Sequence, residues 1–171
     1  MKGSIITALS GIADAATKAA LRNILGGIGG RLVANTVTSP GLTIKAGASA
    51  LVKAATAHYV WFGDRLIAVA ANTDMAALSG TVAADAFNVY SFFVDRAGTE
   101  TSAMGAAGAT LAAVKFPPIP EGKAMQGFLI INPTGTGDFV GGTTALDDAT
   151  VVPTALYVNT FGGIFDPSIQ L

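Results

Sequence analysis

Short apolar runs separated by turn-forming residues dominate the chain beyond residue 57. Residues 58–62 and 65–70 are two such runs, and they flank the pair Gly63-Asp64. An Asp or Gly pair between two apolar runs is typical of a two-residue β-hairpin turn. We therefore expect the first hairpin of the fold at this position.

A second hairpin is predicted where residues 87–94 meet residues 99–103 across Asp95-Arg96-Ala97-Gly98. The glycine of this turn suits a left-handed bulge position. Further strands are expected at 110–116, 127–131 and 151–159. This spacing predicts a mainly β fold, with a body that is an antiparallel β-sandwich or jelly-roll-like.

Two of the expected strands do not alternate apolar with polar residues. Residues 87–94 read Phe-Asn-Val-Tyr-Ser-Phe-Phe-Val, and residues 128–131 are apolar throughout. An antiparallel sheet with one wet face would alternate, so both faces of these strands must be covered. Two covers fit the pattern: other parts of the same subunit, or a neighbouring subunit.

Near the start of the chain, apolar residues recur at helical spacing instead. They form a narrow stripe made of Ile5, Leu9, Ile12, Ala16, Ala20 and Ile24. Ser10 can cap a short α-helix that runs to about Leu25, with Asp14 and Lys18 placed for an i,i+4 ion pair. The glycine-rich residues 26–30 then form a hinge.

Charge and aromatic content divide the chain in the same way. Residues 1–53 carry a net charge of +5 and no aromatic side chain, whereas residues 54–171 carry −6 and every aromatic residue, beginning with Tyr59. A segment without aromatics is poorly equipped to build its own core. We therefore interpret residues 1–40 as an N-terminal arm with the helix and the Gly-rich hinge, and residues 41–171 as a β-rich body.

The composition favours contact with other protein molecules. Apolar residues make up 51% of the chain and charged residues only 12%, against about 25% charged residues in ordinary soluble domains. No stretch supplies the roughly 20 consecutive apolar residues of a membrane-spanning helix, and the amino terminus does not fit a secretory signal. We expect synthesis in the cytoplasm, no membrane partner, and a homo-oligomer.

Motifs for catalysis or cofactor binding find little support. The chain has no cysteine, which excludes disulfides and thiolate chemistry. The one histidine, His58, lies in an apolar strand and fits a satisfied structural imidazole better than a general base, and no Gly-x-Ser-x-Gly elbow is present. Gly27-Ile28-Gly29 lacks the preceding strand and the third glycine of a dinucleotide fingerprint. We expect no enzyme activity, no catalytic or cofactor-binding residues and no cofactor.

Three carboxylates raise the question of a cation site. Asp138, Asp147 and Asp148 bracket one loop, and hard cations favour clustered carboxylates, but the spacing does not match an EF-hand. A solvated loop is the simpler interpretation, so we expect no metal. The basic residues of the arm are scattered and lack interleaved aromatics, which argues against nucleic acid as a partner. A negative protein surface, on a neighbouring body or a capsid shell, fits them better.

Two stretches resemble small virion proteins that are encoded beside the major capsid protein of tailed bacteriophages. They are residues 78–99, which include Leu-Ser-Gly-Thr-Val-Ala-Ala-Asp-Ala-Phe-Asn-Val-Tyr, and residues 139–148, Phe-Val-Gly-Gly-Thr-Thr-Ala-Leu-Asp-Asp. Together they cover about a third of the body. The resemblance implies a head decoration (cement) protein, commonly trimeric, whose partner is the major capsid protein and whose location is the capsid surface of the virion. It brings no catalytic residues with it.

Three hypotheses therefore stand. The first is a structural virion protein that decorates and stabilises the outside of a bacteriophage capsid. The second is another virion component, such as a fibre base or a receptor-binding head, and the third is an enzyme or cellular binding domain. A receptor binder should present aromatics at loop tips, whereas here most aromatics fall on predicted strands. We adopt the first hypothesis.

Overall fold

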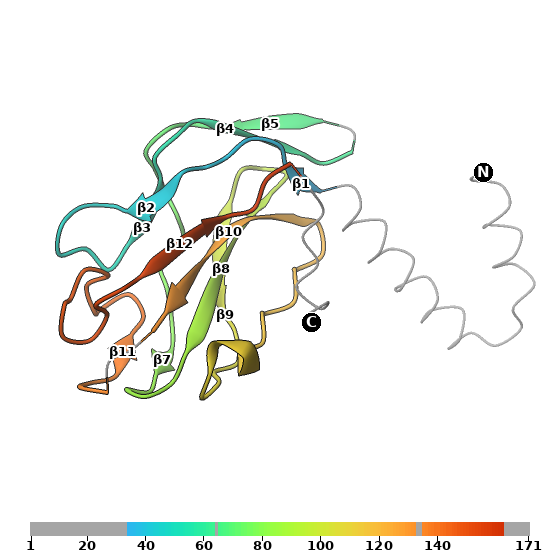
Figure 1. Ribbon diagram of the computed structural model, residues 1–171. Helices are drawn as coiled ribbons and strands as arrows, with labels where there is room; N and C mark the ends of the chain where they lie inside the picture. Colours follow the sequence, from blue (N-terminus) through green and yellow to red (C-terminus); the bar gives the residue numbers. More distant parts are fainter. Residues whose placement is uncertain (1–33, 64, 133–134, 163–171) are drawn as a thin grey trace, which may run out of the picture.

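The computed structural model describes residues 34–63, 65–132 and 135–162 (Figure 1). The predicted helix at residues 10–25 and the Gly-rich hinge lie outside these residues. The strands are β1 (Asn35–Thr36), β2 (Leu42–Ile44), β3 (Val52–Ala54), β4 (His58–Trp61), β5 (Leu66–Val69), β6 (Thr73–Asp74), β7 (Thr81–Val82), β8 (Asn88–Asp95), β9 (Glu100–Met104), β10 (Lys123–Ile131), β11 (Phe139–Val140) and β12 (Leu156–Asn159). The one helical element among the described residues is a 3₁₀ turn, η1 (Leu111–Ala113). The prediction of a mainly β fold is confirmed.

The strands form four antiparallel sheets. The central sheet has the order β12-β10-β8-β9, and what we call the outer sheet has the order β1-β4-β5. Strands β2, β3 and β6 form a third sheet, and β7 pairs with β11 in the fourth. Figure 1 shows the outer sheet beyond one end of the central sheet and the β7–β11 pair at its other end.

One face of the central sheet is covered by the other three sheets. Tyr90, Phe92, Leu129 and Ile131 of the central sheet belong to a core cluster that takes its remaining members from β2, β3, β7, β11 and the loops beside them. Farther along the same face, Val94 packs with Val60 and Ile67 of the outer sheet. All these side chains are at most one-tenth exposed, so the sheets pack in a layered arrangement.

The opposite face of the central sheet is covered by the chain that follows β9. Val89, Phe93 and Phe128 point to this side and pack with Val114 and partly buried Phe116. The rings of Phe116 and Phe128 meet edge to face, with centroids 4.8 Å apart, a favourable geometry for two aromatic rings. Of the two covers considered for the apolar strands, the structure shows the one supplied by the same subunit.

Both predicted hairpins are confirmed. At the first, Phe62 N donates to Arg65 O at 2.9 Å, and Gly63 has φ +84°. At the second, Asp95 Oδ1 accepts hydrogen bonds from the backbone N–H groups of Ala97 (2.8 Å) and Thr99 (2.9 Å), while Gly98 has φ +83°. Glycine is required there because other residues rarely adopt a positive φ.

The prediction of a strand at residues 110–116 is wrong. Leu111–Ala113 forms η1, and only Lys115 makes a β-bridge, to Ala106. Leu and Ala favour helical turns over extended backbone, and Pro117 and Pro118 follow directly. The segment therefore covers the central sheet with Val114 and Phe116 without joining a sheet.

The strand predicted at residues 151–159 is shorter than expected. Only Leu156–Asn159 is extended, as β12. Asp148 Oδ1 accepts hydrogen bonds from the backbone N–H groups of Thr150 (2.8 Å) and Val151 (3.2 Å), which holds the start of the range in a turn. Pro153 lacks the N–H that a sheet ladder needs.

Residues 34–54 form three short strands that the sequence did not predict. β1 belongs to the range assigned to the arm, yet it pairs with β4, and Thr36 Oγ1 donates to Met125 O at 2.8 Å in the interior. The outer sheet thus begins before residue 40. Residues 35–36 are built into the body.

Candidate functional site

The outward side of the outer sheet is the most distinctive surface of the described residues. Val37, Tyr59, Trp61 and Leu66 are 43%, 47%, 41% and 51% exposed, respectively. They lie on neighbouring strands, because Trp61 pairs with Leu66 across the sheet and Val37 N donates to Tyr59 O at 2.8 Å. We call these four residues the apolar face.

Strict alternation of buried and exposed side chains along β4 and β5 creates this surface. Val60 and Ile67 are buried in the core below the sheet, while their neighbours along each strand are exposed. An antiparallel sheet with one wet face normally carries polar residues outside. Exposed Trp and Tyr beside aliphatic side chains, with no charged residue among the four, are typical of protein–protein contact surfaces.

These four residues were not predicted from the sequence. The sequence signal was the run His58-Tyr59-Val60-Trp61, in which large apolar groups occur at both the odd and the even positions of the strand. One set had to face outward once the predicted hairpin formed. Elsewhere in the part of the body that the structure describes, five further large apolar side chains are exposed: Met104, Leu111, Val140, Leu156 and Phe161.

Beneath the outer sheet lies a chain of buried polar side chains. His58 Nε2 is 2.5 Å from Gln126 Oε1, and Gln126 Nε2 donates to Glu100 Oε2 at 2.5 Å. The other ring nitrogen of His58 lies 3.3 Å from Thr56 O. His58 and Gln126 are fully buried, so the imidazole is positioned inside the body as a partnered side chain.

A β-bulge in β10 positions the middle residue of this chain. The register of β10 against β8 shifts between Met125 and Gly127, which leaves Gln126 as the extra residue. A bulge redirects a side chain that a regular strand would place elsewhere. Here it directs Gln126 to His58 of the outer sheet and Glu100 of β9, and the sequence offered no sign of either contact.

Glu100 is the one described carboxylate with a strongly raised pKa. Burial raises its pKa to about 7, the hydrogen bond from Gln126 lowers it, and the charge of Asp95 raises it further. Its second oxygen, Oε1, is buried and has no hydrogen-bond partner among the described residues. The ionised form is therefore poorly accommodated.

The three carboxylates considered for a cation do not converge. Asp138 Oδ1 accepts from Ala84 N at 3.0 Å, and both carboxylate oxygens of Asp147 accept from Ala48 N at 3.0–3.1 Å. Asp148 holds its own turn, as described above. No group of three or more His, Asp or Glu residues that could hold a metal ion occurs within 34–63, 65–132 and 135–162.

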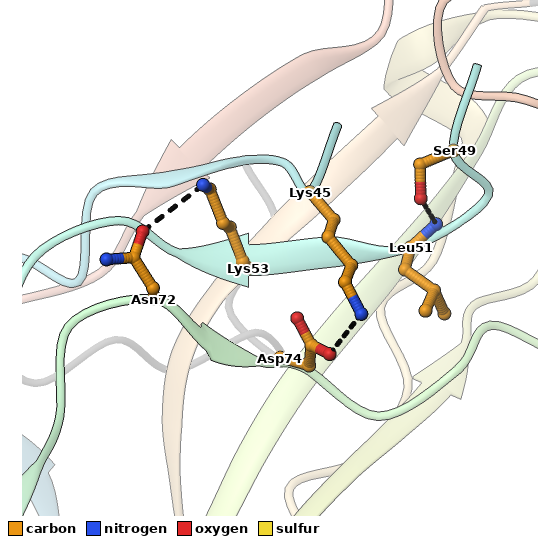
Figure 2. Close-up of polar contacts among 6 residues, drawn as sticks. All are labelled: Lys45, Ser49, Leu51, Lys53, Asn72 and Asp74. Carbon is orange, nitrogen blue, oxygen red and sulfur yellow. Dashed lines mark hydrogen bonds and ion pairs between the residues drawn. The ribbon is translucent and has the colours of Figure 1, made fainter. Parts of the chain in front are cut away.

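The third sheet shows basic and acidic parts of the sequence in contact. Figure 2 shows Lys45, just after β2, whose Nζ lies 2.5 Å from Asp74 Oδ2 of β6, and Lys53 Nζ, which donates to Asn72 Oδ1 at 3.2 Å. In the same view, Leu51 N donates to Ser49 Oγ at 3.1 Å. Lys45 and Asp74 are both nearly half exposed, so their ion pair contributes little to stability.

No helix of the described part of the chain is long and apolar enough to cross a membrane. Comparisons of the chain with known protein families, with curated proteins and with solved structures find no match.

Proposed function

We propose that this chain is a non-catalytic structural protein that decorates and stabilises the outer surface of a bacteriophage capsid. Its partners would be the major capsid protein and further copies of itself, arranged as a homotrimer. Its place would be the capsid surface of the virion, after synthesis in the host cytoplasm. We also propose that the body is a β-sandwich, whose layers are the central sheet and the three sheets that cover it.

The observation that carries the proposal is the surface of the body. Among the described residues, nine large apolar side chains are at least 36% exposed, and they lie on or beside the outer sheet, on β9, on η1, and on or near β11 and β12. Only 12% of the residues of the chain are charged. A surface of this kind is suited to contacts on more than one side, as a protein between a shell and its own copies would need.

The arrangement of the two stretches that resemble phage virion proteins also supports the proposal. β7 lies in the first stretch and β11 in the second, and they pair through Val82 with Phe139 and Thr81 with Val140. Gly141 N donates to Gly80 O at 2.8 Å, and a Cβ on Gly141 would lie 2.9 Å from Ser79 N. Two sequence stretches about 40 residues apart thus form one unit of structure.

The homotrimer now depends on a different surface from the one that the sequence indicated. Strands β8 and β10 are covered within the subunit, so they need no neighbour. Burial of the exposed apolar residues would instead drive trimer formation, because each large apolar side chain moved into an interface contributes roughly 1.5–3 kcal/mol when fully buried. Light scattering at micromolar concentration should give the mass of a trimer, and a monomer would contradict this part of the proposal.

Imaging tests the location directly. Labelled protein should be incubated with purified heads that lack it and viewed in negative stain. Regular spots over the head support decoration. Label confined to the tail or its fibres would contradict the proposal and favour a fibre base or receptor-binding head.

A further inference from the structure

We propose that the free edge of β5, the edge that faces away from β4, pairs with the same edge of a second copy of this chain. The two β5 strands run antiparallel about a two-fold axis, so two outer sheets join into one. The inference rests on the proposed homotrimer only for its place in the assembly, because a two-fold contact joins copies that belong to two different trimers.

β5 is the open side of the outer sheet. At the opposite side of the sheet, beyond β1, Gly162 N donates to Thr36 O at 3.0 Å. Within 34–63, 65–132 and 135–162, β4 is the one strand paired with β5, and no other backbone group forms a hydrogen bond with Leu66–Val69. Figure 1 shows β5 at the margin of the body. An uncovered edge strand is a template for another strand.

The hydrogen bonds of the hairpin show which backbone groups face this free edge. Phe62 N donates to Arg65 O at 2.9 Å, so these two residues form a hydrogen-bonded pair. Hydrogen-bonded and non-hydrogen-bonded pairs alternate along an antiparallel ladder. Ile67 therefore bonds to β4, whereas the N–H and C=O groups of Leu66 and Ala68 point away from it.

The other side of β4 gives the same answer. Val37 N donates to Tyr59 O at 2.8 Å, so the backbone groups of Tyr59 face β1. Tyr59 pairs with Ala68 across the hairpin. Since Tyr59 bonds to β1, this pair is not hydrogen-bonded, and the backbone groups of Ala68 face the free edge.

One antiparallel register of β5 with itself joins all of these outward groups. In this register, Leu66 lies opposite Ala68 of the second copy, Ala68 lies opposite Leu66, and Ile67 lies at the two-fold axis. Each residue contributes one backbone donor and one acceptor, so every outward group of both residues finds a partner. The edge is thus complementary to a second copy of itself, which is the occupant that we assign to it.

The side chains of β5 do not oppose this pairing. Edge strands are usually protected by Lys, Pro or a bulge, but Leu66–Val69 has neither residue type and pairs with β4 in regular register. Arg65, which precedes the strand, would lie opposite Val69 of the second copy. The two Arg65 residues would then be about 14 Å apart along the strands, beyond a Debye length of about 8 Å.

The same register makes the apolar faces of the two copies continuous. Within each copy, Trp61 lies beside Leu66, and Tyr59 lies beside Ala68. Leu66 is 51% exposed and would contact the small side chain of Ala68 in the second copy. A row of apolar side chains therefore runs from Trp61 of one copy to Tyr59 of the other, and it shields the new hydrogen bonds from water.

The contact is short, because β5 has only four residues. We therefore expect trimers at micromolar concentration, and pairing between trimers only in more concentrated protein. On a shell, neighbouring trimers are held close together, and the resulting effective concentration strengthens a weak contact of this kind. The edge of β5 would then link adjacent trimers.

Sedimentation equilibrium of the full-length protein tests the pairing. Ala68→Pro removes the outward N–H without removing a hydrogen bond to β4, and its matched control Ala68→Thr keeps this N–H and suits a strand. We expect the mass of the unchanged protein and of Ala68→Thr to double between about 10 µM and about 1 mM protein. The mass of Ala68→Pro should stay constant over this range.

Disulfide formation tests the register and also decides the question if Ala68→Pro loses its β circular dichroism spectrum. The chain has no cysteine of its own. Leu66→Cys mixed with Ala68→Cys places the two thiols on opposite residues, whose Cα atoms are about 5.5 Å apart in such a pair, within the range of a disulfide. We expect about five-fold more disulfide dimer than from the control mixture of Leu66→Cys with Tyr59→Cys, whose residues lie two strands apart.

Two results would overturn the inference. One is an unchanged protein whose mass stays constant up to the highest concentration. The other is equal disulfide yield from the two mixtures. The readout is the doubling of the mass and not its starting value, so a doubling from monomer to dimer would reject the proposed trimer and leave the pairing of β5 standing. A trimer that does not double would reject the pairing alone.

Discussion

At the scale of single residues, the interior of this protein contains one titratable group in an unfavourable place. Glu100 reaches from β9 toward Gln126, while its Oε1 has no hydrogen-bond partner among the described residues. The hydrogen bond from Gln126 only partly offsets the burial that raises its pKa to about 7. This carboxyl group should make the stability of the fold depend on pH.

We expect the stability to fall as the pH rises from 5 to 8. The folded protein holds the Glu100 proton up to a pKa of about 7, whereas the unfolded chain releases it near the ordinary value of 4.5. The protonated form therefore favours folding, with its full contribution below pH 4.5 and none of it left above pH 7. Glu100→Gln should remove this slope and exceed the unchanged protein at pH 8 by about 1–2 kcal/mol, allowing for the partial exposure of the group.

Urea unfolding at pH 5 and pH 8 measures both effects. Glu121→Gln, which alters an exposed turn carboxylate, serves as the control and should keep the slope of the unchanged protein. A Glu100→Gln variant with the same loss of stability between the two pH values would show that this group is not its source.

His58 should matter for stability. His58→Ala removes a fully buried ring and leaves Gln126 Oε1 without its partner 2.5 Å away. A cavity together with an unpaired buried polar atom costs about 2–4 kcal/mol. Thermal unfolding should show a clear loss of stability, whereas the neighbouring outward change Tyr59→Ala should have a much smaller effect. Unchanged stability in His58→Ala would remove the case for a structural imidazole.

At the scale of elements, the central sheet depends on close backbone approach at the β10 bulge. A Cβ at Gly127 would lie 2.4 Å from Val158 O and 2.5 Å from Leu42 Cδ1, distances that no real contact allows. β12 is held to β10 at this point, where Gly127 pairs with Asn159. Glycine is thus required at position 127 because a Cβ would not fit there, and not because a turn needs it.

Gly127→Ala should therefore lower the free energy of unfolding by about 1–3 kcal/mol, the usual cost of overpacking. Gly47→Ala is the matched control, because a Cβ there would meet only Asp147 Oδ2, at an ordinary 3.9 Å. Chemical denaturation of both variants makes the comparison. Equal denaturation midpoints for the two variants would show that β12 can shift away from β10 without loss of stability.

The elements that the sequence predicted correctly are those whose own residues specify them. The turn at Asp95–Gly98 has its side-chain acceptor and its glycine within four residues, so local chemistry reveals it. β1 and β7 could not be predicted, because two-residue strands have no periodicity and exist only through their partners β4 and β11. The polar chain under the outer sheet was missed for the same reason, since the contact of Gln126 with His58 joins residues 68 positions apart.

At the scale of the whole molecule, the fold limits where the chain can be shortened without loss of a strand. A cut before Ser39 would remove β1 and the buried hydrogen bond from Thr36 to Met125, and with them one edge of the outer sheet. A cut before Ala34 keeps every described strand. The comparison of intact and shortened protein should therefore use residue 34 as the new start.

Binding to heads tests most directly whether this protein decorates a capsid. Full-length protein, and protein that begins at Ala34, should be incubated with undecorated heads and sedimented, with fully decorated heads as the control for occupied sites. We expect saturable binding of the full-length protein to undecorated heads only, and weaker binding of the shortened protein. Added salt should weaken the electrostatic part of this binding, because charges are screened over a Debye length of about 8 Å at physiological ionic strength. Full-length protein that stays in the supernatant, or that sediments equally with decorated heads, would contradict the claim that this protein decorates a capsid.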